Sequence, residues 1–233
     1  DSLIKLLSDT NARVRESAVT ALGQIGNQQA IESLIKALQD VDKRVAEQAA
    51  ESLVNIKNLN FESMDTVANT FYTNKDYKRA EAVLGRQITE YSKQPELQEK
   101  ILQTKIKLAK TLFALKDWQK SLALYEELVK RFSNDNLIKI ELIQCLKETK
   151  QYDRALEWCV IWIKESPQNN QLCWQCRLEI ANAMFEQGKF DTVKTLIDTL
   201  IAENPNLGGN ELKPQFQKLS ELCAQKDFPA KKR

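Results

Sequence analysis

Histidine is missing from the whole chain of 233 residues. Its absence excludes Ser-His-Asp and Cys-His catalysis, histidine-ligated metal sites and histidine-based pH switching. No apolar run approaches the roughly 20 residues that span a bilayer, and the chain does not open with the basic and apolar stretches of a secretory signal. The sequence therefore predicts no membrane contact and leaves few routes to catalysis.

Glycine, proline and excess charge are also scarce. Only 6 Gly and 5 Pro occur, too few for the many turns of a sandwich or barrel, so long helices joined by short loops are expected. The 34 basic and 32 acidic residues leave a net charge of +2, which gives no electrostatic drive towards nucleic acid. With 42% hydrophobic residues, the chain is expected to fold around a real core.

The cysteines are few, odd in number and scattered through helical patterns. They are Cys145, Cys159, Cys173, Cys176 and Cys223. Such spacing does not predict a disulfide framework, and it favours a reducing, cytoplasmic location. Cys173 and Cys176 form a C-x-x-C motif, but no second pair completes a zinc site and no strand precedes it as in thioredoxin-like motifs. We interpret both as packing residues, with a metal or redox role as the alternative, and predict no cofactor and no metal.

The first 57 residues contain an internal repeat. Sliding 2–25 onto 33–56, a shift of 31, makes twelve of the 24 aligned residues identical. Each copy predicts two helices, with apolar residues three and four apart. Polar residues such as Asp9 and Asn11 stand where they can cap the second helix, and Gly26 stands where that helix should stop.

This pattern resembles the short bacterial HEAT-like repeat of the phycobilisome-lyase type. The resemblance rests on the run from Asp9 to Ile25, with Val14-Arg15 at its centre, and on its second copy, where Ala46 replaces the arginine. Because the repeat is already under way at the first residue, we expect further repeats or another domain before it.

A different repeating sequence pattern begins near residue 61. An aromatic residue is followed three positions later by a small or aliphatic one, and a short polar turn precedes each aromatic. The pairs are Tyr77 with Ala80, Trp118 with Ser121, Tyr152 with Ala155 and Phe190 with Val193. The pattern resembles the tetratricopeptide repeat, whose helix pairs place an aromatic residue at the turn. Two of the three spacings, 41 and 38 rather than 34, indicate insertions.

The two resemblances together imply an all-α fold, an α-solenoid in which stacked helical hairpins form a right-handed superhelix. We expect two HEAT-like repeats in 1–57, four tetratricopeptide-like repeats in 58–210, a capping helix in 211–226 and a tail in 227–233. The geometry of the tetratricopeptide family implies that first helices line a concave groove. The partner-facing residues would then be Asn69, Tyr72, Gln103, Lys107, Lys110, Glu141, Gln144, Glu148, Glu179, Asn182 and Phe185.

Three hypotheses for function follow. The first is a protein-interaction scaffold that catalyses nothing itself and binds a protein or peptide of mixed charge, either as a monomer or as part of a larger chain. The second is the sensor or regulatory arm of a larger enzyme, such as a signalling ATPase or kinase. The third, implied by the HEAT resemblance alone, is a bilin lyase-like chaperone of a chromophore protein.

Overall fold

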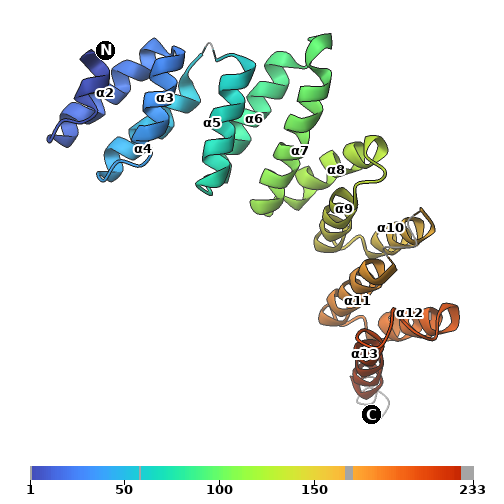
Figure 1. Ribbon diagram of the computed structural model, residues 1–233. Helices are drawn as coiled ribbons and strands as arrows, with labels where there is room; N and C mark the ends of the chain where they lie inside the picture. The colour runs from blue at the N-terminus through green and yellow to red at the C-terminus, as the bar shows by residue number, and fades with distance from the viewer. Residues whose placement is uncertain (1, 58, 166–169, 227–233) are drawn as a thin grey trace. The chain divides into compact units, whose positions relative to one another are not determined.

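The computed structural model describes residues 2–57, 59–165 and 170–226, and these residues form helices and connecting turns with no strand among them. The expected tail at 227–233 lies outside this part. The chain divides into two compact units, Asp1–Leu124 and Tyr125–Arg233, with the division inside α8 (Figure 1). The fold is an all-α solenoid built from successive helix pairs, as the sequence predicts.

The first unit contains the following elements: α1 (Ser2–Leu6), α2 (Ala12–Ile25), α3 (Gln28–Ala37), α4 (Lys43–Asn55), α5 (Phe61–Thr73), α6 (Tyr77–Tyr91), the 3-10 helix η1 (Pro95–Leu97), α7 (Gln98–Ala114) and the start of α8 (Trp118–Arg131). The second unit holds the rest of α8, then α9 (Asn136–Glu148), α10 (Tyr152–Glu165), α11 (Asn170–Glu186), α12 (Phe190–Glu203) and α13 (Lys213–Lys226). Together, η1 and the 17-residue α7 account for the long spacing between Tyr77 and Trp118.

The ends of the HEAT helices lie where their polar residues predict. The side chain of Asn11 accepts a hydrogen bond from the Arg13 amide at the start of α2, and Asp42 does the same for α4. Gly26 ends α2 in the left-handed conformation, with φ of 58°, and its amide donates to the Leu22 carbonyl. Local capping chemistry therefore sets these helix boundaries.

Each of the four later turns also contains one left-handed residue. Lysine occupies this position in three turns and glycine in the fourth: Lys75 (φ 62°), Lys116 (φ 61°), Lys150 (φ 60°) and Gly188 (φ 75°). In each turn, the amide of the residue after the left-handed one donates to a carbonyl five residues earlier. Gln151, for example, donates to the Leu146 carbonyl at 2.8 Å. This is the Schellman arrangement, which ends the first helix and starts the second at a fixed angle.

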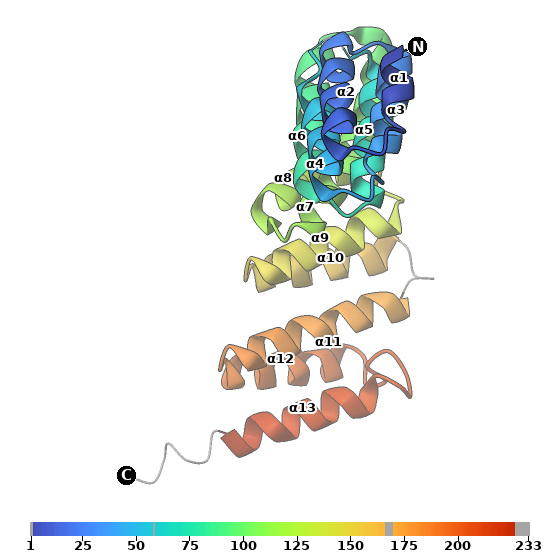
Figure 2. The same ribbon diagram turned by 90° about the vertical axis from the view of Figure 1, so that its left-hand side faces the viewer.

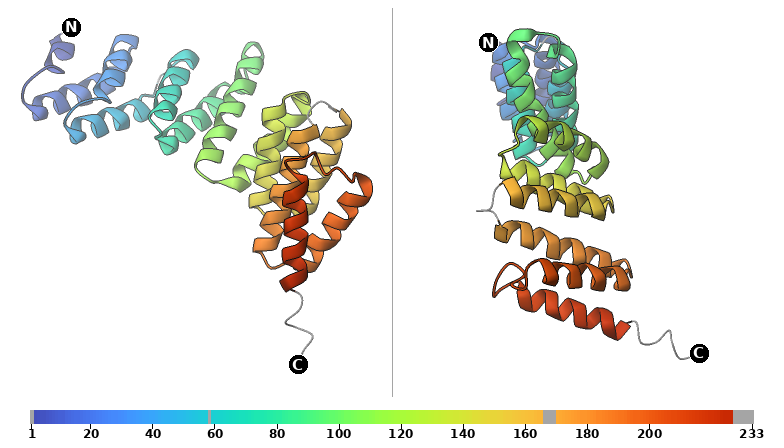
Figure 3. Two further views of the ribbon diagram at one scale, coloured as in Figure 1. Left: turned by 60° about the horizontal axis from the view of Figure 1, so that its bottom comes forward. Right: turned by 90° about the vertical axis from the view of Figure 1, so that its right-hand side faces the viewer.

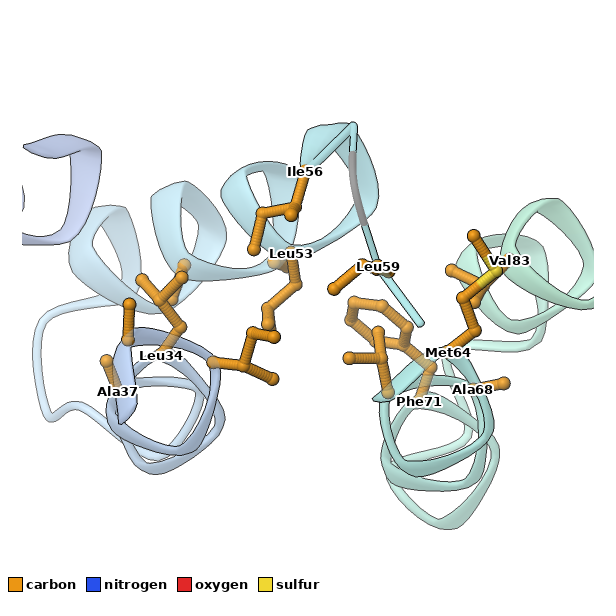
Figure 4. Close-up of a cluster of buried hydrophobic side chains, with 14 of the residues drawn as sticks. Leu34, Ala37, Leu53, Ile56, Leu59, Met64, Ala68, Phe71 and Val83 are labelled. Atoms are coloured by element: carbon orange, nitrogen blue, oxygen red, sulfur yellow. The ribbon is translucent and has the colours of Figure 1, made fainter. Parts of the chain in front are cut away.

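The core of the first unit continues from the HEAT helices into α5 and α6 without a break. Figure 4 shows Leu53 and Ile56 of the second repeat beside Leu59, with Met64 and Phe71 of α5 on the other side. All five side chains are buried. Residue 57, where the sequence predicts a change of repeat type, is therefore not a boundary between separate cores.

Side chains of α6 hold the connection between α4 and α5. Arg86 donates to the carbonyls of Ile56 and Lys57, each at 2.7 Å, and to that of Val54 at 3.3 Å. The next turn adds to these contacts: Gln87 Nε2 donates to the Phe61 carbonyl at 2.9 Å and the Tyr91 hydroxyl to that of Leu59 at 2.9 Å. The carbonyls of Val54, Ile56, Lys57 and Leu59 lie at or beyond the end of α4 and face no regular helical donor, so these contacts satisfy groups that would otherwise need water.

In the second unit, α9 to α12 form two helix pairs and α13 packs against α11 and α12 (Figures 2 and 3). Trp162 of α10 and Phe216 of α13 are fully buried. Pro214 lies in the first turn of α13, where its missing N–H costs no helical hydrogen bond. The ring of Phe216 meets Trp174 of α11 edge-on at 6.1 Å, so α13 covers an apolar face of α11.

Candidate functional site

A hollow of about 430 Å³ lies between α5 and α7, the first helices of two successive helix pairs. Its walls are Phe61, Glu62, Asp65, Thr66, Lys100, Gln103 and Lys107. Lys107 Nζ lies 2.6 Å from Asp65 Oδ1, and Lys100 Nζ lies 2.8 Å from Glu62 Oε1. We call this the α5–α7 hollow.

The charges of the α5–α7 hollow are arranged as two ion pairs at its surface. The hydrogen bond from Lys100 lowers the pKa of Glu62, and the Lys100 ammonium also lies 5.6 Å from the centre of the Phe61 ring. Both ion pairs are partly exposed, so each contributes little to stability and remains open to exchange with an incoming group.

Two further hollows lie between α9 and α11. The larger, about 360 Å³, is lined by Lys147, Glu148, Lys150, Tyr152, Glu179, Asn182, Ala183, Glu186 and Gln187, and we call it the α9–α11 hollow. The smaller, about 70 Å³, is lined by Ile140, Ile143, Gln144, Lys147, Leu172, Gln175, Cys176, Glu179 and Ile180, and we call it the aliphatic hollow. The two share Lys147 and Glu179, whose charged groups lie 3.3 Å apart.

Six of the eleven predicted partner-facing residues line these hollows. Gln103 and Lys107 line the α5–α7 hollow, and Gln144, Glu148, Glu179 and Asn182 line those of the second unit. Asn69 lies nearby, where its amide donates to Asp65 Oδ2 at 3.1 Å. Lys110 is half-buried on α7, one turn beyond Lys107.

The other three predicted residues contact their own chain. Glu141 accepts a hydrogen bond from the Tyr125 hydroxyl at 2.6 Å. The Tyr72 ring packs edge-on against Tyr77 at 5.4 Å. Phe185 packs against Phe190 at 5.0 Å in the same way. These three contacts tie the first helix of a unit to a neighbouring second helix, so they serve packing as well as any role at the surface.

Several lining residues were not predicted. Lys100 lies one turn before the predicted Gln103, and Glu62 lies two turns before the predicted Asn69, each on the same helix face, so extending the helical period backwards would have found them. Tyr152 and Glu186 belong to the turn end of the α9–α11 hollow. The sequence predicts Tyr152 only as the aromatic residue at a turn. The packing of α11 against α9 makes it a wall of the hollow.

A fourth hollow, of about 480 Å³, lies in the HEAT part between the carboxyl-terminal halves of α2 and α4. Gly23 permits this close approach, since a Cβ atom there would lie 2.7 Å from the Cβ of Ser52. The walls are mostly uncharged polar side chains, among them Gln24, Gln48 and Asn55. No predicted partner-facing residue lies there.

The cysteines are packing residues in the structure. All five thiols are buried. Burial raises the pKa of Cys159 strongly, that of Cys173 to about 11 and that of Cys176 to about 12, which keeps the three thiols protonated at neutral pH. Across the described ranges, no group of three or more acidic or cysteine side chains is placed to hold a metal ion.

Comparison with protein families gives two matches. Residues 1–85 match HEAT repeats, and residues 105–135 match a tetratricopeptide repeat. The order of the two matches, HEAT repeats before a tetratricopeptide repeat, is the order that the sequence predicts. The HEAT match extends past residue 57 into α5 and α6, the same stretch over which the core is continuous. Folds of these two kinds typically serve as scaffolds for protein–protein interaction.

Several solved structures are similar. MamA MSR-1 C2 is 13% identical with a TM-score of 0.48, covering 91% of this chain and 99% of its own. A second similar structure is a putative kinesin light chain of Podosopora anserina with nearly identical TPR-like repeats. Its sequence identity to this chain is 14%, its TM-score is 0.47, and the match covers 98% of this chain and 99% of that one. The third is Pseudomonas aeruginosa pilF, with a sequence identity of 16% and a TM-score of 0.44; the match covers 94% of this chain and 96% of that one. The search of curated proteins finds no match. Among the described helices, none is long and apolar enough to cross a membrane.

Proposed function

We propose that the chain is a protein-interaction scaffold that holds a peptide segment of its partner against the first helices of its tetratricopeptide-type units and catalyses no reaction itself. The observation that carries the proposal is the pair of hollows at α5–α7 and α9–α11. Both are bordered by first helices, and both have walls of carboxylate, ammonium and amide groups within reach of a bound backbone.

The proposed contact residues are those that the sequence predicts. They are Asn69, Tyr72, Gln103, Lys107, Lys110, Glu141, Gln144, Glu148, Glu179, Asn182 and Phe185. Exposed ion pairs such as Lys107 with Asp65 suit this role because a partner's charge can replace one member at small cost. A segment of mixed charge is therefore the proposed ligand.

The chemistry of the side chains supports a binding role over a catalytic one. The sequence contains no histidine, and the thiols of Cys159, Cys173 and Cys176 have pKa values raised by burial, so they are poor nucleophiles. A net charge of +2 provides no general attraction for nucleic acid, so the proposed partner is a protein. Five thiols suit a reducing compartment, and the proposal places the chain in the cytoplasm as a monomer or as part of a larger chain.

The test is affinity capture with mass spectrometry on the full chain and on the double variant Lys107→Glu with Lys110→Glu. We expect the chain to recover a specific protein and the double variant to lose it. The matched control is Lys78→Glu, a reversal on the exposed surface of the second helix α6, which should retain the partner.

A second control separates loss of binding from loss of the Lys107–Asp65 ion pair. The exchange Asp65→Lys with Lys107→Glu keeps an ion pair but inverts its direction, so it should also lose the partner while melting like the parent chain. Recovery of the same protein by all the variants would contradict the proposal, as would turnover of a small molecule with no protein recovered.

A further inference from the structure

The third tetratricopeptide-type unit lacks an aromatic pair that the other three possess. In the others, the last turn of the first helix carries an aromatic ring that meets the turn aromatic edge-on. The pairs are Tyr72 with Tyr77 at 5.4 Å, Phe113 with Trp118 at 5.0 Å and Phe185 with Phe190 at 5.0 Å. Each pair spans five residues, and five residues before Tyr152 the chain has Lys147 instead. The α9–α11 hollow lies beside this substitution.

Tyr152 forms a wall of that hollow and is only 5% exposed. Its hydroxyl makes no hydrogen bond with any residue of the described part of the chain. Burial raises the pKa of this hydroxyl, and the carboxylates of Glu148 and Glu186 raise it further. The Lys189 ammonium lies 5.0 Å from the centre of the ring. The hydroxyl oxygen itself touches solvent, so a ligand that enters the hollow can reach it and gain a hydrogen bond there.

The other walls of the hollow contain three carboxylates, which accept hydrogen bonds, beside two lysines and two side-chain amides. Glu186 makes no ion pair among the described residues, and Glu148 accepts one hydrogen bond, from Gln144 Nε2 at 2.8 Å. The third carboxylate, Glu179, is already matched by Lys147. Two carboxylates and a tyrosine oxygen therefore remain to receive donors, and the remaining lysine of the walls, Lys150, lies exposed at the turn.

The aliphatic hollow adjoins this acceptor-lined space. Four of its walls are Ile140, Ile143, Leu172 and Ile180, and its volume of about 70 Å³ suits a small side chain. Because Lys147 and Glu179 border both hollows, one bound segment can place one side chain in each.

We propose that the α9–α11 hollow binds an arginine side chain of the partner, with a small aliphatic side chain of the same segment in the aliphatic hollow. This inference rests on the proposed scaffold function and adds the chemistry of the bound segment. Arginine fits better than lysine because its planar fork offers five donors that can reach Glu148, Glu186 and the Tyr152 oxygen together. An acidic side chain in the same place would face two carboxylates and is disfavoured.

Fluorescence anisotropy with the full chain tests the inference. The probes are three labelled pools of peptides about nine residues long. Each pool carries arginine, lysine or glutamate at the central position, with Ala, Val, Ser and Gly elsewhere. We expect the arginine pool to bind, the lysine pool to bind several-fold more weakly and the glutamate pool not to bind. Equal binding of the arginine and glutamate pools would overturn the inference.

Variants of the chain then locate the site. Glu186→Gln and Tyr152→Phe should each weaken the arginine pool by about tenfold, the loss expected for one hydrogen bond to a charged group. Glu203→Gln, an exposed change at the end of α12, is the matched control and should bind like the parent chain. Circular dichroism melts verify that Tyr152→Phe remains folded. Unchanged affinity of a folded Glu186→Gln chain would also overturn the inference.

Each of the two proposals can be contradicted without the other. If no peptide pool binds but affinity capture still recovers a protein that depends on Lys107 and Lys110, the scaffold function stands and the arginine site is wrong. If capture fails while the arginine pool binds and depends on Glu186, the hollow binds arginine but the proposed partner contact at α7 is wrong.

Discussion

The guanidinium of Arg15 holds the carboxylate of Asp40 through two hydrogen bonds, from Nε to Oδ2 at 2.8 Å and from Nη2 to Oδ1 at 2.7 Å. The two residues belong to different HEAT repeats, and each side chain is only 11% exposed. Arg15 also donates to the carbonyl of Asp9 at 2.8 Å. A single arginine thus joins the turn of its own repeat to the turn of the next one. In the second repeat Ala46 occupies the equivalent position, so this bridge is not repeated.

The Arg15–Asp40 pair predicts a loss of stability in acid. The hydrogen bond from Arg15 lowers the pKa of Asp40 below its usual value, so the folded chain binds this proton less readily than the unfolded chain. The resulting stability is present above about pH 4, the ordinary aspartate pKa, and is lost as the pH falls through the lower folded value.

Thermal melts of the parent chain and Asp40→Asn between about pH 7 and pH 3 measure this effect. The variant should melt lower at neutral pH, and the two curves should converge in acid, where Asp40 is itself uncharged. Asp198→Asn, an exposed change on α12, should follow the parent throughout. A gap between parent and Asp40→Asn that stays constant with pH would contradict the prediction.

Arg86 is expected to be the side chain on which the connection from α4 to α5 depends most. Replacing it with methionine removes hydrogen bonds to the carbonyls of Val54, Ile56 and Lys57. We expect the free energy of unfolding of the first unit to fall by about 2–4 kcal/mol, because these bonds have a charged donor and the carbonyls lose their partners.

Hydrogen exchange gives the local readout for Arg86. Amides of residues 54–61, other than the undescribed residue 58, should exchange faster in Arg86→Met, while those of α9 to α13 should be unchanged. Arg86→Lys keeps the positive charge but not the planar guanidinium with its several donors, so an intermediate loss of amide protection is expected. Equal protection in all three chains would show that the carbonyls do not depend on this side chain.

The left-handed turn residues predict unequal responses to substitution. Gly188→Val should lower the free energy of unfolding by about 1–2 kcal/mol, because a β-branched residue is strained at φ of 75°. A Cβ at this position would meet no atom within 4 Å, so a clash cannot explain the loss. Lys150→Gly relieves strain but adds freedom to the unfolded chain, so a change within about 0.5 kcal/mol is expected. Urea denaturation distinguishes the two, and an equal loss in both would rule out backbone strain as the cause.

The buried thiols should be inert in the folded chain. Burial raises the pKa of Cys173 to about 11 and of Cys176 to about 12, so few thiolates form at pH 8 and reagents reach them only after opening. An aromatic disulfide reagent should therefore label the thiols slowly in buffer and rapidly in denaturant. A Ser133→Cys variant, with an added exposed thiol, should react at once at that position. Rapid labelling of the native parent chain would contradict the buried placement.

The residues of the candidate site were predictable only in part. The helix faces that carry Gln103, Lys107, Glu179 and Asn182 follow from the 3.6-residue period, and the structure places all four on hollow walls. The unpartnered hydroxyl of Tyr152 does not follow from any period, because the absence of a partner depends on how α9 and α11 pack. The contact of Glu141 with Tyr125 was missed for the same reason: periodicity does not show which neighbour a side chain will meet.

The sequence by itself determined the all-α solenoid class, the positions of the turns and the helix caps. These features depend on residues within one or two turns of each other: Asn11 caps α2 through an amide two residues on, and Lys150 and Gly188 mark turns closed by nearby backbone hydrogen bonds. Only the tertiary structure decided that the helices before and after residue 57 share one core and that Arg86 reaches carbonyls 29 to 32 residues away. The physical reason is the distance along the sequence over which each interaction acts. Caps and periods are set by local backbone chemistry, whereas cores, hollows and unpartnered groups depend on which helices stack together.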